Sequence, residues 1–200
     1  MFDIAPKLRS VANALTILDL LAELGELSLV EIAARLDVAP STAHRLLATL
    51  AELGYVQRDP ANKRYRIALK VFRIGTSAIQ QIGLAHIALP EMTRLSALSA
   101  ETVSLGVPHG VEMMYIERIE APQTVRSDYP LGHCAPAYCT ALGKAYLAAL
   151  PVEERRRLLD RVRLEPRTRF TIVDRDQLER ELERVRLQGY AVEIGASKRE

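Results

Sequence analysis

The segment at residues 28–54 constrains the fold of this chain more than any other. Ser28 and Glu31 have the spacing of a capping box, in which each side chain bonds an otherwise unpaired backbone N–H at the start of a helix. Pro40 suits the first position of a second helix because it has no N–H to lose. Two short helices joined by a tight turn form the outline of a helix-turn-helix, so the segment predicts a DNA-binding regulator.

The helix expected from Pro40 carries the candidate DNA-reading residues. Its apolar positions, which recur at helical spacing and are expected to face the core, are Ala43, Leu47, Leu50 and Leu53. The opposite face carries short donors and one long cation, which suit a major groove because Arg can bind guanine and small side chains allow close approach. These candidate readers are Ser41, Thr42, His44, Arg45 and Thr49. A solvated helix face is the alternative interpretation, but the cap, the turn and the basic residues that follow favour DNA binding.

A basic hairpin is expected directly after this helix. Residues 55–58 and 64–67 alternate like two short strands around a turn at residues 59–63, which predicts a wing. Residues 38–73 carry seven basic and two acidic residues, a net charge of +5, whereas the whole chain carries only +2. Positive charge gathered in one segment is suited to a polyanion. The wing residues expected to meet the DNA backbone are Lys63, Arg64 and Arg66.

The rest of the chain predicts a linker followed by a mixed domain. Residues 68–84 have helical spacing, and their apolar positions exceed what a tether needs, so they either pair with a second copy or pack onto their own domains. The later elements expected from the pattern are a helix opened by Pro90, strands at 102–107 and 111–119 around a hairpin turn at 108–110, a helix ending near residue 150, helices at 152–163 and 175–188, and a strand starting at 190–194.

Several function classes are disfavoured by composition and motifs. No apolar run approaches the roughly 18 residues needed to span a bilayer, and the N-terminus lacks the apolar core of a signal peptide, so a cytoplasmic protein is expected. Cys134 and Cys139 have no partners at metal-ligand spacing, so neither a metal nor a cofactor is expected. Ser104, His109 and Asp128 could form a triad on paper, but no G-x-S-x-G turn, G-x-G-x-x-G or P-loop accompanies them. The sequence therefore does not predict an enzyme.

Taken together, these segments resemble the IclR family of bacterial transcriptional regulators over nearly the whole chain. The matching segments are RSVANALTILDLLA, LSLVEIAARLDVAPSTAHRLLATLAELGYVQRD, RYRIALKVFRIG, PAYCTALGKAYLA and FTIVDRDQLERELERVRLQGYAV. Winged helices occur in many families, whereas this ordered set is specific. The resemblance implies an α+β protein with an N-terminal winged helix-turn-helix (1–70), a helical linker (71–86) and a C-terminal GAF-like α+β domain (87–200) that binds an effector and builds dimers or tetramers.

The resemblance also implies an effector site in the C-terminal domain. Its residues would be Gly132, His133, Cys134, Tyr138, Cys139, Thr140 and Ala141. Tyr138 stands where many family members have His, and His133 is either a donor to an acidic effector or a structural residue. The segment PAYCTALGK is most similar to members that respond to aromatic acids of the β-ketoadipate pathway. A small carboxylic or aromatic acid is therefore the expected effector.

Two further expectations follow from the resemblance. Family members continue past the equivalent of residues 189–192 into two more strands and a terminal helix, so the effector domain is expected to be shortened and incomplete. The expected partners are a second copy of the chain and double-stranded operator DNA with an inverted repeat, whose half-sites lie about 34 Å apart. The alternative is an enzyme subunit that uses a winged helix only for dimerisation, although such a domain would not need the net charge of +5.

Overall fold

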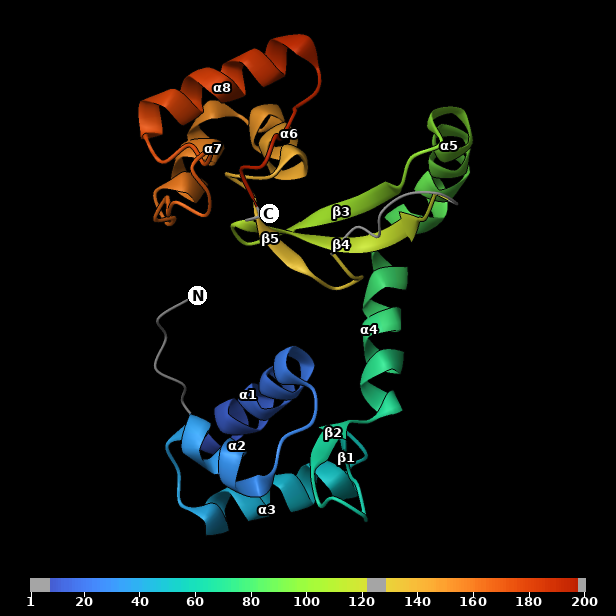
Figure 1. The fold of residues 1–200 in the computed structure, drawn as a ribbon, viewed down its shortest axis with the longest axis vertical. Coiled ribbons are helices and arrows are strands. Elements are labelled where there is room, and N and C mark those ends of the chain that lie inside the picture. Colours follow the sequence, from blue (N-terminus) through green and yellow to red (C-terminus); the bar gives the residue numbers. More distant parts are fainter. Residues whose placement is uncertain (1–7, 122–128, 198–200) are drawn as a thin grey trace. The chain divides into compact units, whose positions relative to one another are not determined.

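The computed structural model describes residues 8–121 and 129–197 (Figure 1). The chain divides into two compact units, Met1–Gln81 and Ile82–Glu200. The division falls inside the segment 71–86 that was expected to link two domains.

The first unit is a winged helix-turn-helix, as predicted. Its elements are α1 (Arg9–Leu24), α2 (Leu29–Leu36), α3 (Pro40–Glu52), β1 (Val56–Arg58), β2 (Tyr65–Ile67) and α4 (Leu69–Ile82). The capping box is confirmed, because the Ser28 N–H donates to Glu31 Oε2 at 2.7 Å and the Glu31 N–H donates to Ser28 Oγ at 3.3 Å. Asp37 ends α2 in the left-handed conformation, and Pro40 begins α3. The turn between the two helices is thus encoded locally.

One hydrophobic core holds these elements together. Its buried side chains come from the three helices, both strands and the segment before α2; they are Ile17, Leu21, Leu27, Ile32, Leu47, Leu50, Val56 and Tyr65. Leu53 was expected among them but is 53% exposed. Leu53 is the C-terminal cap of α3, one residue beyond Glu52, and the buried stripe of the helix ends one turn earlier at Leu50.

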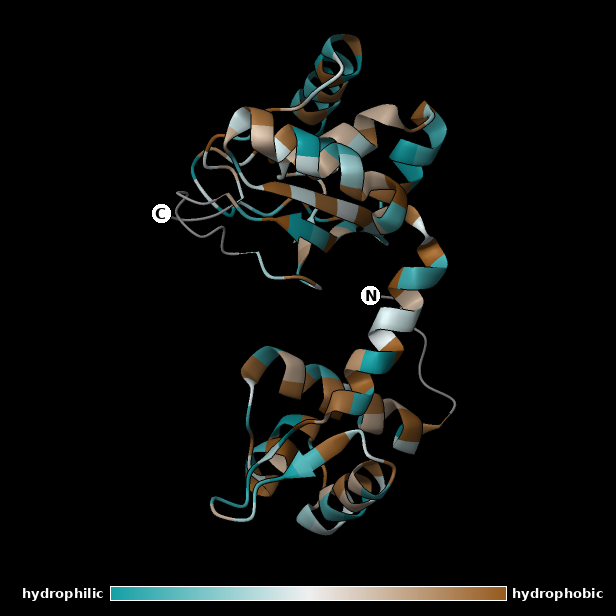
Figure 2. Ribbon diagram, turned by 90° about the vertical axis from the view of Figure 1, so that its right-hand side faces the viewer, coloured by the Kyte–Doolittle hydropathy of each residue, from teal (hydrophilic) through white to brown (hydrophobic). Residues whose placement is uncertain are grey.

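Helix α4 is apolar on its surface. None of its residues is buried, and Leu69 and Phe72 are 86% and 73% exposed. Figure 2 shows hydrophobic residues along this helix among hydrophilic ones. The first turn of α4 still contacts its own domain, because Lys70 Nζ donates to the Leu53 carbonyl at 2.7 Å. Both interpretations of the helix, pairing with a second copy and packing onto its own domains, stay predictions.

In the described residues of the second unit, a three-stranded antiparallel sheet is combined with four helices. The strands are β3 (Val103–His109), β4 (Glu112–Ile119) and β5 (Cys134–Pro136), in the order β3-β4-β5. The helices are α5 (Leu84–Ser99), α6 (Ala141–Ala149), α7 (Val152–Leu159) and α8 (Arg175–Gln188). Both α5 and α6 contact β3 and β4, and α8 packs on α6 (Figure 1). The interior is filled by side chains such as Leu147, Leu178 and Leu182.

Several predicted elements of this unit need correction. Pro90 does not open a helix: α5 begins at Leu84, after Gly83 in the left-handed conformation, and Pro90 lies inside it. The hairpin turn is shorter than predicted, because residues 108 and 109 belong to β3 and pair with β4. Helix α7 ends at Leu159, and residues 190–194 form no strand. The predicted cap of α8 is confirmed, since the Gln177 N–H donates to Asp174 Oδ1 at 2.7 Å.

No helix within residues 8–121 and 129–197 combines the length and the hydrophobicity that crossing a membrane would require.

Candidate functional site

The outward face of α3 is formed as predicted. All five candidate readers are exposed, namely Ser41, Thr42, His44, Arg45 and Thr49. They point away from the core because the inward stripe of the same helix is buried. The Thr49 hydroxyl donates to the Arg45 carbonyl at 3.0 Å, whereas the Arg45 guanidinium has no hydrogen bond or ion pair with any described residue. A long cation that the fold leaves unpaired on an exposed helix can be used for an external acceptor.

The wing is a two-stranded ribbon with a turn built by one aspartate. Strands β1 and β2 pair antiparallel, with Gln57 opposite Arg66. Asp59 Oδ1 accepts the N–H of Ala61 at 2.7 Å and that of Asn62 at 3.2 Å. These two bonds lower the pKa of the Asp59 carboxyl, since they stabilise its charged form. The turn is therefore ordered by its own side chain.

The root of the wing is tied to the segment between α1 and α2. Leu27 and Tyr65 form an antiparallel bridge, with N–H donation in both directions at 3.0 and 2.7 Å. Strand β2 consequently has a hydrogen-bonded neighbour on each side, β1 on one and Leu27 on the other.

The three predicted wing cations occupy different environments. Lys63 is exposed at the turn with φ +61°, and Arg66 is half exposed with its Nη1 3.6 Å from Glu26 Oε1. The Arg64 guanidinium instead turns back onto the domain, where Nη2 lies 2.8 Å from Glu31 Oε2 and 2.9 Å from the Glu26 carbonyl oxygen. A contact from Arg64 to DNA stays a prediction. The sequence pattern missed the contacts within the domain, because the partners lie more than 30 residues away along the chain.

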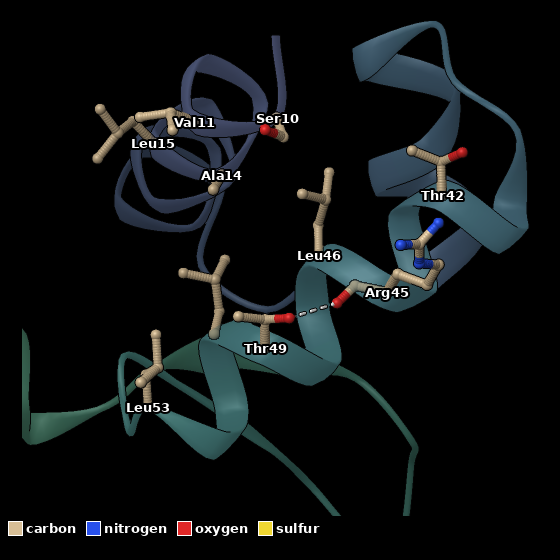
Figure 3. A pocket seen from close by; sticks show the side chains of 10 residues that line it. Ser10, Val11, Ala14, Leu15, Thr42, Arg45, Leu46, Thr49 and Leu53 are labelled. Carbon is tan, nitrogen blue, oxygen red and sulfur yellow. Dashed lines mark hydrogen bonds between the residues drawn. The ribbon is translucent and has the colours of Figure 1, made fainter. Parts of the chain in front are cut away.

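An apolar pocket of about 480 Å³ lies between α1 and α3 (Figure 3). Val11 and Leu15 of α1 line it on one side, and Leu46 of α3 and the cap residue Leu53 line it on the other. Three candidate readers, Thr42, Arg45 and Thr49, also line it. The exposed position of Leu53 is thus part of an apolar surface beside the proposed reading face.

The predicted effector loop docks on the central strand of the second unit. The Gly132 N–H donates to the Tyr115 carbonyl at 2.7 Å, and the Tyr115 N–H donates to the His133 carbonyl at 3.0 Å. The His133 ring lies 4.9 Å from the ring of Tyr129, which stacks on Tyr115 at 5.3 Å. Cys134 begins β5, the strand that the sequence pattern missed. The loop therefore ends in a stack of three aromatic rings.

The other predicted effector residues have structural roles in this chain. The Tyr138 hydroxyl donates to the Glu165 carbonyl at 2.9 Å, and Cys139 is fully buried, which raises the pKa of its thiol. Thr140 caps α6, because its Oγ1 accepts the Gly143 N–H at 3.1 Å, and Ala141 is the first residue of that helix. The cavity that Tyr138 lines measures about 10 Å³, room for about one water and too small for an organic acid.

Metal-ligating side chains do not gather in the part of the chain that the structure covers: no group of three or more His, Cys, Asp or Glu residues could hold an ion there.

Comparison with known proteins matches both units to domains of one protein family. Residues 10–60 match the family described as "IclR helix-turn-helix domain", and residues 76–197 match "Bacterial transcriptional regulator IclR C-terminal". The chain is 36% identical over 186 residues to the HTH-type transcriptional regulator BhcR from Paracoccus denitrificans (strain Pd 1222), which covers 93% of this chain and 67% of that protein. The chain spans between 59% and 75% of the length of the first curated relatives that it matches.

Solved structures of similar proteins have the same fold. The IclR transcriptional regulator from Alicyclobacillus acidocaldarius superposes on this chain with a TM-score of 0.81 at 31% identity, over 96% of this chain and 78% of that one. An IclR homolog from Microbacterium hydrocarbonoxydans, solved with 4-hydroxybenzoate, has the same fold at 22% identity, with a TM-score of 0.80 over 95% of this chain and 78% of that one.

Proposed function

The chain belongs to the IclR family of bacterial transcriptional regulators, and we propose that it binds operator DNA as a homodimer under the control of a small organic acid. The observation that carries the proposal is the exposed face of α3 beside a basic wing. That face offers hydroxyls, one imidazole and the Arg45 guanidinium, which pairs with none of the residues that the structure describes, whereas the wing offers Lys63 and Arg66. DNA binding would also place the protein in the cytoplasm.

On the proposed interface, α3 enters the major groove and the wing follows the backbone. Ser41, Thr42, His44, Arg45 and Thr49 are the proposed readers. Arg45 is the side chain best suited to guanine O6 and N7, since its fork can bind both atoms. Lys63 and Arg66 would neutralise phosphates, which fixes the register of the protein without reading bases.

The proposed homodimer rests on the exposed apolar residues of α4. Leu69 and Phe72 lie almost entirely in solvent, and exposed apolar surface of this kind marks protein interfaces. A two-fold dimer would present two copies of α3 to successive major grooves about 34 Å apart, so the operator should be an inverted repeat. Light scattering of the full chain would distinguish a dimer from a tetramer built of two such dimers.

The proposed effector is a small carboxylic or aromatic acid bound by the second unit. The aromatic stack that ends at His133 supports this class, because flat rings pack on flat ligands and an imidazole can donate to a carboxylate. Gly132 and Cys134 flank His133 in the same loop, and residues 138–141 are included in the proposed site on the family resemblance alone. An effector can change DNA affinity only if it binds the two arrangements of the dimer with different affinities.

The central test is binding of labelled DNA from upstream of the gene, measured by fluorescence anisotropy between about 50 and about 200 mM salt. Two phosphate contacts from each wing of a dimer predict that log K falls with log salt at a slope of about −4. A scrambled duplex of the same length serves as the control. A folded, dimeric protein without salt-dependent binding would favour the alternative of a winged helix used only for dimerisation.

The effector is tested by a thermal-shift screen of small acids that includes 4-hydroxybenzoate, because a protein of the same fold binds it. A ligand at 100 times its dissociation constant should stabilise the folded state by about 2.7 kcal/mol. His133→Ala should abolish the shift, whereas His86→Ala, on the exposed surface of α5, should leave it unchanged. A screen with no shift from any acid would contradict this part of the proposal.

A further inference from the structure

The carboxylate of Glu31 has two roles in the structure. It accepts the N–H of Ser28 at 2.7 Å, which completes the cap of α2. It also accepts Arg64 Nη2, at 2.8 Å on Oε2 and 3.2 Å on Oε1. The cap alone would need only one of these bonds, so the second links the start of α2 to the wing.

Arg64 is held by backbone as well as by charge. Its Nη2 and Nε donate to the Glu26 carbonyl at 2.9 and 3.2 Å, and its own N–H donates to Asn62 Oδ1 at 2.9 Å. Asn62 in turn donates from Nδ2 to Glu26 Oε2 at 3.3 Å. The turn of the wing, up to the residue before its second strand, is therefore fixed to residues 26–31 through side chains. We call this set of contacts the wing clamp (Glu26, Glu31, Asn62 and Arg64).

The wing needs such support because its strands are short. Strands β1 and β2 have three residues each, and an isolated two-stranded ribbon is at best marginally stable in water. The Leu27–Tyr65 bridge fixes only the root of the wing. Ordering the turn before DNA arrives removes an entropic cost from binding.

We propose that Arg64 is a positioning residue for DNA binding: through Glu31 and Glu26 it sets the direction of the wing, so that Lys63 and Arg66 meet the DNA backbone. The proposal rests on the proposed function. It implies that an acidic residue, Glu31, favours the binding of a polyanion. Arg64 acts through the clamp and not through a phosphate.

The two possible roles of Arg64 predict opposite effects at Glu31. If Arg64 binds a phosphate directly, removal of the Glu31 charge takes a repulsive group away from the DNA, and binding becomes tighter or stays the same. If Arg64 acts through the clamp, removal of that charge releases the wing, and binding becomes weaker. The sign of the change therefore decides between the two roles.

The experiment measures operator affinity of the full chain for Glu31→Gln, Arg64→Gln and the double variant. Gln at this position still accepts the Ser28 N–H, so the cap of α2 survives and the variant should fold. We expect each single variant to bind about tenfold more weakly than wild type, the size of one lost charge-assisted hydrogen bond. The double variant should bind about as weakly as either single variant, because both remove the same contact.

Two further variants provide controls. Arg64→Lys keeps the positive charge but loses the fork that reaches Glu31 and the Glu26 carbonyl together, so it should bind nearly as weakly as Arg64→Gln. Glu52→Gln removes an exposed acid at the end of α3 that is outside the clamp, and it should not weaken binding. Melting curves of every variant establish that each is folded.

The outcomes separate the clamp from the proposed function. Wild-type affinity in Glu31→Gln, full rescue by Arg64→Lys, or losses that add in the double variant would overturn the clamp while leaving DNA binding intact. A wild-type protein that does not bind DNA would overturn both.

Discussion

Arg45→Ala is the substitution that most directly tests the reading face. Arg45 is exposed on α3, and its guanidinium makes no hydrogen bond or ion pair with the described residues. Its removal should therefore change the free energy of unfolding by less than about 0.5 kcal/mol. A bidentate contact from Arg to guanine contributes about 1–3 kcal/mol of discrimination, so operator affinity should fall by about 5- to 150-fold.

The assay compares the operator with a random duplex at a fixed salt concentration. Arg45→Ala should lose affinity mainly for the operator, since its contact is to a base. Lys63→Gln is the matched control: it should weaken binding to both duplexes alike and reduce the salt slope by about one unit for each wing. Equal losses on both duplexes in Arg45→Ala would refute the reading role and leave Arg45 as a residue that only positions the protein.

Five other substitutions have defined outcomes. The pKa of Glu31 is lowered from 4.5 to about 2, first by the hydrogen bond from the Ser28 N–H. Wild type should therefore lose stability as the pH falls from about 4.5 to about 2. Urea titrations should find a smaller loss in Glu31→Gln. Gly143→Ala would place a Cβ 2.2 Å from the Ala137 Cα and should lower the free energy of unfolding by about 3 kcal/mol. Gly75→Ala has nothing within 4 Å of its Cβ and should raise the free energy of unfolding by about 1 kcal/mol. Similar melting temperatures of the two variants would contradict this. Leu182→Ala, at a fully buried position of α8, should lower the free energy of unfolding by about 2–5 kcal/mol, and a loss below 1 kcal/mol would mean that the core closes around the gap. Phe72→Asp should yield a folded monomer by light scattering, and a persistent dimer would show that α4 is not the interface.

The helix-turn-helix could be predicted from sequence because its signals are local. The Ser28–Glu31 pair, Pro40 and the apolar spacing of α3 each act within about one turn of helix, where chemistry and geometry are tightly coupled. The same holds for Asp174 at the start of α8. The prediction that Leu53 is buried was wrong. Leu53 lies just beyond the end of α3, and periodicity determines the ends of helices poorly.

The parts that could not be predicted depend on contacts between distant segments. Strand β5 has three residues, and only pairing with β4 makes them a strand. Arg64 was expected at a phosphate because the sequence shows its charge but does not show that Glu31 lies beside it in the fold. The partners of the Tyr138 and Thr140 hydroxyls, the Glu165 carbonyl and the α6 cap, were likewise not predicted, whereas a contact of either residue with an effector stays a prediction. Local patterns do not record which residues a side chain will meet.

The bridge between Leu27 and Tyr65 separates the wing into two parts that depend on different kinds of bond. The root is held by N–H and carbonyl groups, which every residue other than proline supplies. The turn is held by particular side chains, those of Asp59 and Asn62. Substitutions around residues 59–63 can therefore change what the wing presents to DNA while its attachment to the helices is kept. The overall strength of DNA binding can thus be adjusted at the turn, while the reading face of α3 and the fold that carries it stay unchanged.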